Sequence, residues 1–290
     1  MMSTCTYTLI HSLSGNMVFK VVPLDGLTSL EQVQRLNHYS MILITEGGGE
    51  LQSDFSEYHF AGDSLLCFAP YQPFRIHAPG SKGFVVNFHP DFFCIYRHHK
   101  DVGCHGMLFN NIYRPPFHAL EGPVQEKLLT IIGDMRRELQ TEALGQYELL
   151  ASLLKIFLIT ATRSKAALPE SSRQAGAGME EPFVMQKLKD AIEEHYRQKH
   201  SAGEYADLLH ISPKALAKIT KNHFNRTLTN MIAERIIIEA KRELYMSGKP
   251  VKAIAYELGF ADEYHFSRFF KNKAEISPQV YRSQVGFAKE

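Results

Sequence analysis

The feature that most constrains how this chain can fold is a helical pattern that occurs twice in its C-terminal part. In each copy a short apolar-periodic segment ends at a break and an amphipathic segment follows, which is typical of a helix-turn-helix unit. Ala206 and Leu209 recur as Ala255 and Leu258, 49 residues later. Beyond the break the offset is 50, and the matched pairs are Leu216 with Phe266, Lys218 with Arg268, Ile219 with Phe269, and Lys221 with Lys271. The repeat predicts two helix-turn-helix units, and a helical bundle with fortuitous internal symmetry is the alternative.

Capping and helix-breaking residues predict where the C-terminal helices begin and end. Ser201 and Glu204 have the spacing of a capping box. A longer helix is predicted over residues 228–246, before Gly248. At 1.5 Å per residue it would be about 28 Å long, which is close to the ~34 Å repeat of B-DNA. The second helix of each unit could therefore enter successive major-groove segments on one side of a duplex.

Charge is divided between the two parts of the chain. Residues 183–290 hold 18 Lys and Arg against 13 Asp and Glu, whereas residues 1–182 hold 14 against 18. A basic C-terminal part permits nucleic-acid binding, although a solvated charged face explains the same surplus. No apolar run is long enough for a membrane span, the first residues do not form a signal peptide, and the four cysteines show no disulfide spacing. A cytoplasmic protein without a membrane partner is expected.

The N-terminal domain, residues 1–163, is predicted to be a β-barrel followed by two helices. Over about 1–115, short β-branched and aromatic runs alternate with Gly and Pro turns, which is typical of a small barrel or sandwich. Apolar residues at helical spacing predict helices over about 123–163, and such stripes are either core or a dimer surface. Residues 164–182 are rich in Ser, Ala and Gly and predict a flexible linker to a helical domain over 183–290. The expected fold class is α+β with two domains.

Two C-terminal segments resemble a known family. The stretch Val251-Lys-Ala-Ile-Ala-Tyr-Glu-Leu-Gly-Phe-Ala-Asp-Glu-Tyr-His-Phe-Ser-Arg-Phe-Phe-Lys271 and the stretch Ile276-Ser-Pro-Gln-Val-Tyr-Arg282 resemble the signature of the AraC/XylS bacterial transcription regulators. The similarity covers about 185–285, and the N-terminal part resembles, more loosely, the cupin-like sensor domain of such regulators. The resemblance implies a cupin-like barrel with dimerising helices and a seven-helix DNA-binding domain. It also implies a homodimeric regulator without enzymatic activity, which binds promoter DNA and RNA polymerase and responds to a signal such as a small-molecule effector.

The sequence departs from the family at two positions that usually hold glycine. These positions are Asn225 and Glu275. Asn tolerates a left-handed helix stop, whereas the Cβ of Glu275 makes positive φ costly. Strain or a different closure is therefore expected after the second unit.

Candidate DNA contacts follow from the positions that match the family. Arg268 is the strongest candidate for a guanine contact because its planar fork fits the O6 and N7 acceptors, and Lys218 is its counterpart in the first unit. Asp262 is expected to cap a helix. The candidates for phosphate contacts are Lys214, Lys221, Asn222 and Lys271, with a solvated helix face as the alternative for each lysine. The full predicted DNA-binding set is Lys214, Ala217, Lys218, Lys221, Asn222, Tyr264, His265, Arg268 and Lys271.

The predicted barrel also offers candidate ligand and metal residues. No metal or other cofactor is expected, because the chain lacks the His-x-His and spaced Glu of metal-dependent cupins. The rival interpretation is a metal-binding or enzymatic cupin with an accessory helical domain. The predicted lining of an effector site is His38, Tyr39, Tyr71 and His77. The candidate zinc ligands are Cys94, His98, His99, Cys104 and His105, whose spacing fits no common structural-zinc pattern.

Overall fold

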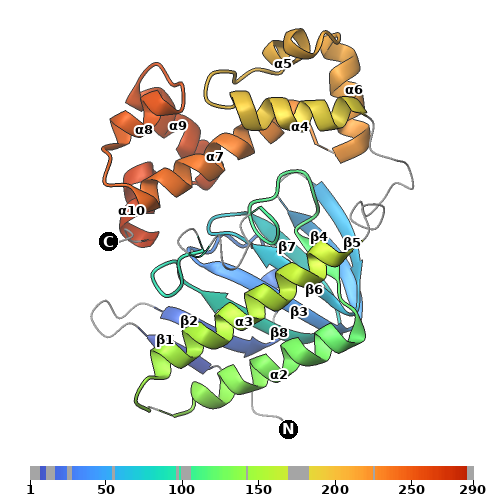
Figure 1. The fold of residues 1–290 in the computed structure, drawn as a ribbon, viewed down its shortest axis with the longest axis vertical. Coiled ribbons are helices and arrows are strands. Elements are labelled where there is room, and N and C mark those ends of the chain that lie inside the picture. The colour runs from blue at the N-terminus through green and yellow to red at the C-terminus, as the bar shows by residue number, and fades with distance from the viewer. Residues whose placement is uncertain are drawn as a thin grey trace. The chain divides into compact units, whose positions relative to one another are not determined.

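A computed structural model of the chain describes residues 7–10, 17–24, 28–53, 56–95, 98, 106–141, 143–168, 183–224 and 226–285. The chain divides into two compact units, drawn in Figure 1. The first unit comprises Met1–Asn111 and Pro115–Pro169, and the second comprises Ile112–Arg114 and Glu170–Glu290. None of the described helices is long and apolar enough to cross a membrane.

The first unit is built on two separate antiparallel sheets. The larger has the order β1-β2-β8-β3-β6-β9 and the smaller has the order β5-β4-β7. The chain leaves the larger sheet at Gly47, whose φ of 90° and close approach to Ser81 exclude a side chain. The expected barrel therefore takes the form of two facing sheets. The strands are β1 (Tyr7–Ile10), β2 (Met17–Pro23), β3 (Tyr39–Glu46), β4 (Gly48–Ser53), β5 (Ser56–Ala61), β6 (Ser64–Phe68), β7 (Phe74–His77), β8 (Lys82–Phe88) and β9 (Phe117–Ala119), with a 3-10 helix, η1 (Thr28–Glu31).

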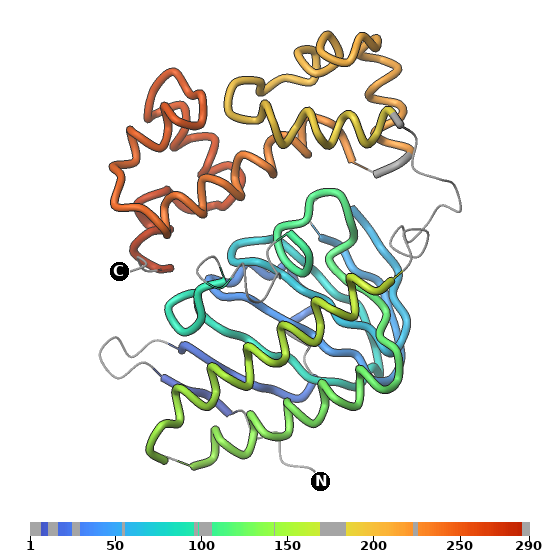
Figure 2. Tube along the Cα trace, in the orientation of Figure 1, coloured from blue at the N-terminus to red at the C-terminus, as the bar shows by residue number. Residues whose placement is uncertain are grey.

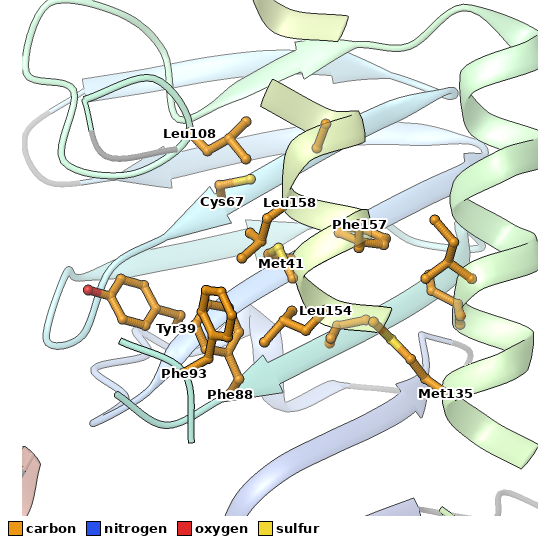
Figure 3. Close-up of a cluster of buried hydrophobic side chains, with 14 of the residues drawn as sticks. Tyr39, Met41, Cys67, Phe88, Phe93, Leu108, Met135, Leu154, Phe157 and Leu158 are labelled. Atoms are coloured by element: carbon orange, nitrogen blue, oxygen red, sulfur yellow. The ribbon is translucent and has the colours of Figure 1, made fainter. Parts of the chain in front are cut away.

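Strand β3 has both faces buried and separates two apolar cores. Met41 and Leu43 belong to the core beneath the two helices of this unit, part of which is shown in Figure 3. Ile42 and Ile44 belong to the core between the two sheets. Successive side chains of a strand point to opposite faces, so a continuous apolar run serves both cores.

Helices α2 (Gly122–Glu138) and α3 (Gln146–Ala167) cover one face of the larger sheet, as Figures 1 and 3 show. Helix α3 continues to Ala167, one turn past the predicted start of the linker. Lys165 explains this extension because it is 4% exposed and its Nζ donates to the carbonyl of Pro115 at 3.4 Å. Its aliphatic stem prolongs the buried stripe of α3. Residues 169–182 of the predicted linker lie outside the described residues.

Over residues 183–285 the described part of the second unit consists of helices and the loops that join them, and a long helix connects its two halves. Helix α7 packs on α4, α5 and α6 at one end and on α8, α9 and α10 at the other, an arrangement that Figure 2 shows as a trace. The helices are α4 (Phe183–His195), α5 (Ala202–Leu209), α6 (Pro213–Phe224), α7 (Leu228–Met246), α8 (Val251–Glu257), α9 (Glu263–Ala274) and α10 (Pro278–Val285).

The predicted helix boundaries of the second unit are confirmed where their residues are described. Ser201 and Glu204 form the capping box in front of α5. The carboxylate of Asp262 accepts the N–H of His265 at 2.7 Å and caps α9. Glu275 adopts the left-handed conformation with φ 63°, so the chain makes the expected turn at a residue that has a Cβ. Asn225 lies outside the described residues.

Gly259 closes the turn between α8 and α9. Its φ is 79°, and a Cβ added there would lie 1.9 Å from the carbonyl oxygen of Arg197. Only glycine satisfies both requirements. The turn of the second helix-turn-helix is therefore specified by one residue.

We expect Gly259→Ala to destabilise the protein by at least about 1 kcal/mol, because the backbone contact and the positive φ both oppose a methyl group. Urea unfolding followed by circular dichroism measures the change. Gly133→Ala is the matched control: Gly133 lies inside α2 with nothing within 4 Å of an added Cβ, so it should stabilise by about 0.5–1 kcal/mol. An unchanged unfolding midpoint for Gly259→Ala would contradict this assignment.

Candidate DNA-binding interface

Helices α6 and α9 each bury one face and expose the opposite one. Leu216 and Thr220 are buried on α6, and Phe266 and Phe270 are buried on α9. Both pairs are four residues apart, so each helix has one face directed into the unit and one directed to solvent. All nine predicted contact residues are exposed: Lys214, Ala217, Lys218, Lys221, Asn222, Tyr264, His265, Arg268 and Lys271.

The first helix-turn-helix is formed by α5, a left-handed turn and α6. His210 ends α5 with φ 54°, and the hydroxyl of Ser212 accepts the N–H of Ala215 at the start of α6. Inside α6, the hydroxyl of Thr220 donates to the carbonyl of Leu216 at 2.6 Å and is satisfied in the interior. Local capping thus fixes both ends of the turn that orients α6.

Phe260 fixes α9 at the second turn. Its ring centroid lies 5.3 Å from that of Phe266 and 5.1 Å from that of Phe269. The His265 ring lies nearly perpendicular to the Phe260 ring, and the two ring centroids are 5.7 Å apart. Aromatic pairs at these separations add to the stability gained by burial. The neighbouring Tyr264 is 88% exposed, so its ring is presented to solvent.

The exposed residues of α6 and α9 give each helix a basic outer face. Lys214, Lys218 and Lys221 lie on α6, and Arg268 and Lys271 lie on α9. Lysine provides a mobile point charge, whereas the guanidinium of Arg268 can form two parallel hydrogen bonds. Such faces bind phosphates through charge and base edges through hydrogen bonds.

Comparisons with known proteins agree with this geometry. The family model described as a helix-turn-helix domain matches residues 205–284. The HTH-type transcriptional activators RhaS of Yersinia pestis (strain Pestoides F) and Yersinia pseudotuberculosis (serotype O:1b) are each 30% identical over 112 residues. Those matches cover 39% of this chain and 41% of each relative. Residues 205–284 form an AraC-type helix-turn-helix domain.

Two solved structures are also similar to this chain. The C-terminal domain of the response regulator yesN from Fusobacterium nucleatum is 24% identical, with a TM-score of 0.33, and covers 34% of this chain and 97% of that chain. ToxT from Vibrio cholerae is 16% identical, with a TM-score of 0.39, and covers 92% of this chain and 98% of that chain. The chain spans about two fifths of the length of the RhaS relatives that it matches.

Glu239 on α7 organises the charges inside the AraC-type domain. It is 5% exposed, and its carboxylate accepts from Arg197 at 3.1 Å, Arg242 at 2.7 Å and Arg235 at 3.3 Å. Burial alone would raise the pKa of Glu239, but the charges of Arg235 and Arg242 outweigh it and hold this pKa below its ordinary value. The carboxylate therefore stays ionised and links α7 to the segment that follows α4.

Arg282 is a residue whose role the sequence analysis did not predict. Its guanidinium donates to the carbonyls of Leu244 at 3.0 Å and Lys249 at 2.8 Å. Burial lowers the pKa of Arg282. These bonds satisfy carbonyls at and beyond the C-terminus of α7 and attach α10 to them. The only available signal was its place in the family signature.

The structure separates the four predicted ligand residues of the first unit. Tyr39 points into the core beneath α2 and α3, where its ring stacks on Phe88 at 4.9 Å, as Figure 3 shows. His77 is on the outer face of β7 and pairs with Glu31 at 3.4 Å. Tyr71 is buried with φ 56°, and burial raises its pKa. His38 is also buried, so only His38 and Tyr71 stay candidates for an interior site.

A row of polar residues that the sequence analysis missed lies beside His38. Lys20, Asn87 and Ser40 are cross-strand neighbours on β2, β8 and β3. They share the face of the larger sheet that contributes Ile42 to the inter-sheet core. Within the described part of the chain, the Oγ of Ser40, the Oδ1 of Asn87 and the Nε2 of His38 are buried without a hydrogen-bond partner.

The candidate zinc cluster is described only at Cys94 and His98. The ring of His98 stacks on Phe93 at 4.6 Å. The side chains of His99, Cys104 and His105 lie outside the described residues. Among those that are described, no three His, Cys, Asp or Glu residues are placed to hold a metal ion together.

Proposed function

We propose that this chain is a sequence-specific DNA-binding transcription regulator that reads two successive major-groove segments with α6 and α9. The observation that supports this most directly is that both helices expose a basic face and are backed by the same helix, α7. A common support fixes the spacing of the two readers. Contact with RNA polymerase belongs to this proposed role.

The length of α7 suits the geometry of B-DNA. Its 19 residues correspond to about 28 Å. Successive major-groove segments on one side of a duplex are about 34 Å apart. Two helices packed near opposite ends of α7 can therefore enter neighbouring segments without bending the protein.

The two kinds of cation on these helices have different proposed roles. Arg268 contacts a guanine edge and specifies sequence, whereas Lys271 contacts a phosphate and adds affinity. On α6, Lys218 takes the role of Arg268, and Lys214 and Lys221 contact the backbone. Tyr264 and His265 flank Arg268 and provide apolar and hydrogen-bonding contact to neighbouring bases.

We expect Arg268→Ala to weaken binding to the selected DNA site by about 1–3 kcal/mol and to relax the base preference at one position, because a bidentate contact is lost. Lys271→Ala should instead weaken binding to all sequences about equally and reduce the salt slope by about 1. Selection of bound fragments from random DNA, followed by titrations at two salt concentrations, measures both effects.

Arg137→Ala is the control and should leave DNA binding unchanged. It removes the same charge from an exposed position of α2 in the first unit. Equal loss on every sequence for Arg268→Ala would show that Arg268 contacts only phosphate. Failure of the unaltered protein to enrich any motif would contradict the proposed function and would favour the cupin-like alternative.

We also propose that the polar row Lys20, Ser40 and Asn87, together with His38, is a small-molecule sensor site. Burial, followed by the charges of His89 and Lys20, lowers the pKa of His38 to about 4, so His38 is neutral near pH 7. Its Nδ1 lies 3.0 Å from the Oδ1 of Asn37, which makes Nδ1 the donor and leaves Nε2 as an acceptor. With two acceptors and one hydroxyl unpartnered, the row suits a small neutral ligand that carries hydrogen-bond donors.

Replacement of Asn87 separates a ligand site from a structural row. Because its Oδ1 has no partner, Asn87→Leu should leave the unfolding temperature unchanged or raise it. The variant should also lose any rise in unfolding temperature that small hydroxylated compounds give the unaltered protein. Asn111→Leu is the control, since it loses a hydrogen bond that is made to the carbonyl of Gly106 at 2.8 Å. A fall in unfolding temperature for Asn87→Leu would show that the row is structural.

We further propose that α3 provides the surface of a homodimer. Leu149 and Ile156 are 48% and 46% exposed and lie seven residues apart, on one face of α3. Large apolar side chains arranged along one exposed helix face are typical of interfaces.

Ile156→Glu should convert the dimer to a monomer, because a charge at the centre of an apolar interface must be desolvated. Sedimentation velocity measures the mass. Thr130→Glu, which adds the same charge to an exposed position on α2, is the control and should remain dimeric. Equal masses for both variants would place the interface elsewhere.

A further inference from the structure

Three residues from the middle of the N-terminal part belong to the helical unit. Ile112–Arg114 follow β8 and precede β9 in the sequence, yet they are grouped with Glu170–Glu290. The residues on either side, Asn111 and Pro115, are grouped with the first unit. The chain therefore enters the helical unit twice, and we call the first entry, Ile112–Arg114, the strap.

Tyr113 attaches the strap to α4. Its hydroxyl donates to the Oε1 of Glu193 at 2.9 Å, and the Nζ of Lys189 lies 5.7 Å from its ring centroid. Burial, followed by the charge of Glu193, raises the pKa of Tyr113, so its hydroxyl remains a donor at neutral pH. A hydrogen bond to a charged acceptor is stronger than one between neutral groups.

The same carboxylate joins the strap to α7. Glu193 also accepts from the Nε of Arg235 at 2.8 Å, and Arg235 pairs with Glu239 at 3.3 Å. Tyr113 is thus connected through two ion pairs to the buried carboxylate that organises the AraC-type domain.

Ile112 attaches the strap to the end of the first reading helix. Its carbonyl accepts from the Nη1 of Arg226 at 3.3 Å, and its side chain is 5% exposed. Arg226 lies two residues after α6 and pairs with Glu234 of α7 at 2.6 Å, with both side chains buried. Buried ion pairs need further hydrogen bonds to offset their desolvation, and the Ile112 carbonyl supplies one.

The connection from the strap to β9 is short and stiff. Only Pro115 and Pro116 separate Arg114 from Phe117, the first residue of β9, and proline fixes φ near −65°. Both carbonyls are held inside the first unit, Pro115 by Lys165 at 3.4 Å and Pro116 by the N–H of Cys67 at 2.8 Å. The chain therefore leaves the strap through a stiff connection of two residues.

We propose that the strap is an integral part of the AraC-type domain and that it positions the end of α6. This inference rests on the proposed DNA-reading role of α6. Tyr113 and Arg226 are then positioning residues, which act on DNA binding through α6 without touching the DNA. A strap that only fills space is the other outcome of the tests below.

The main test examines whether the strap positions α6 in the full chain. Tyr113→Phe should raise amide exchange at α4 and at the α6–α7 junction about tenfold, because a hydrogen bond to a carboxylate is lost there. It should leave α8 and α9 unchanged. Affinity should fall for DNA with an intact α6 half-site and stay the same for DNA in which that half-site is scrambled.

Tyr147→Phe is the matched control. Its hydroxyl donates to the carbonyl of Phe92 at 3.0 Å within the first unit, so its loss should leave exchange in the helical unit unchanged. Glu193→Ala removes the acceptor of this bond, so adding Tyr113→Phe to Glu193→Ala should produce little further change. Unchanged exchange and affinity for Tyr113→Phe would overturn the positioning role.

These readouts also separate this inference from the proposed function. Exchange is measured without DNA, so it reports on the strap even if no sequence-specific DNA binding is found. If the unaltered protein selects a two-part site and Tyr113→Phe binds it equally well, the strap inference fails and the DNA-binding function stands.

Discussion

The packing of α4 against α7 in the second unit depends on the buried carboxylate of Glu239. Glu239 sits on the helix that every helix-turn-helix element contacts, and it accepts hydrogen bonds from three arginines. A charge in this position costs desolvation free energy, so it is tolerated only while those arginines stay in place. The requirement is mutual for Arg235, whose side chain is only 18% exposed. Arg197 follows α4, and Arg235 and Arg242 lie on α7 itself. The carboxylate thereby fixes α4 against α7, and α6 and α9 both pack on α7.

The first unit solves a different packing problem. Its larger sheet is buried on both faces, by α2 and α3 on one side and by the smaller sheet on the other. Strands of this kind need long apolar runs, which β3 provides over residues 41–44 and β6 over residues 65–68. The polar row of Lys20, Asn87 and Ser40 interrupts this pattern on the inter-sheet side. Buried polar groups without partners cost desolvation free energy, and this cost is the basis of the proposed ligand site.

Much of the second unit could be predicted because its determinants are local. A capping box spans four residues, a helix makes one turn every 3.6 residues, and Asp262 caps the helix that begins at the next residue. The exposed faces of α6 and α9 follow from the same periodicity. Long-range contacts leave no such pattern. The burial of Lys165 and the bonds made by Arg282 depend on residues that are far apart in the chain. Tyr39 and His38 are neighbours in the chain but are directed to opposite faces of the sheet.

The sequence by itself determined the pair of helix-turn-helix units, the ends of their helices and the residues that those helices expose, because hydrogen bonding within a helix and capping act over a few residues. Only the tertiary structure decided that the N-terminal strands form two facing sheets, that a polar row lies between those sheets, and that Ile112–Arg114 pack into the helical unit. These features depend on which distant segments share an interior. That choice is made by the burial of apolar surface over the whole chain, and no short window of sequence records it.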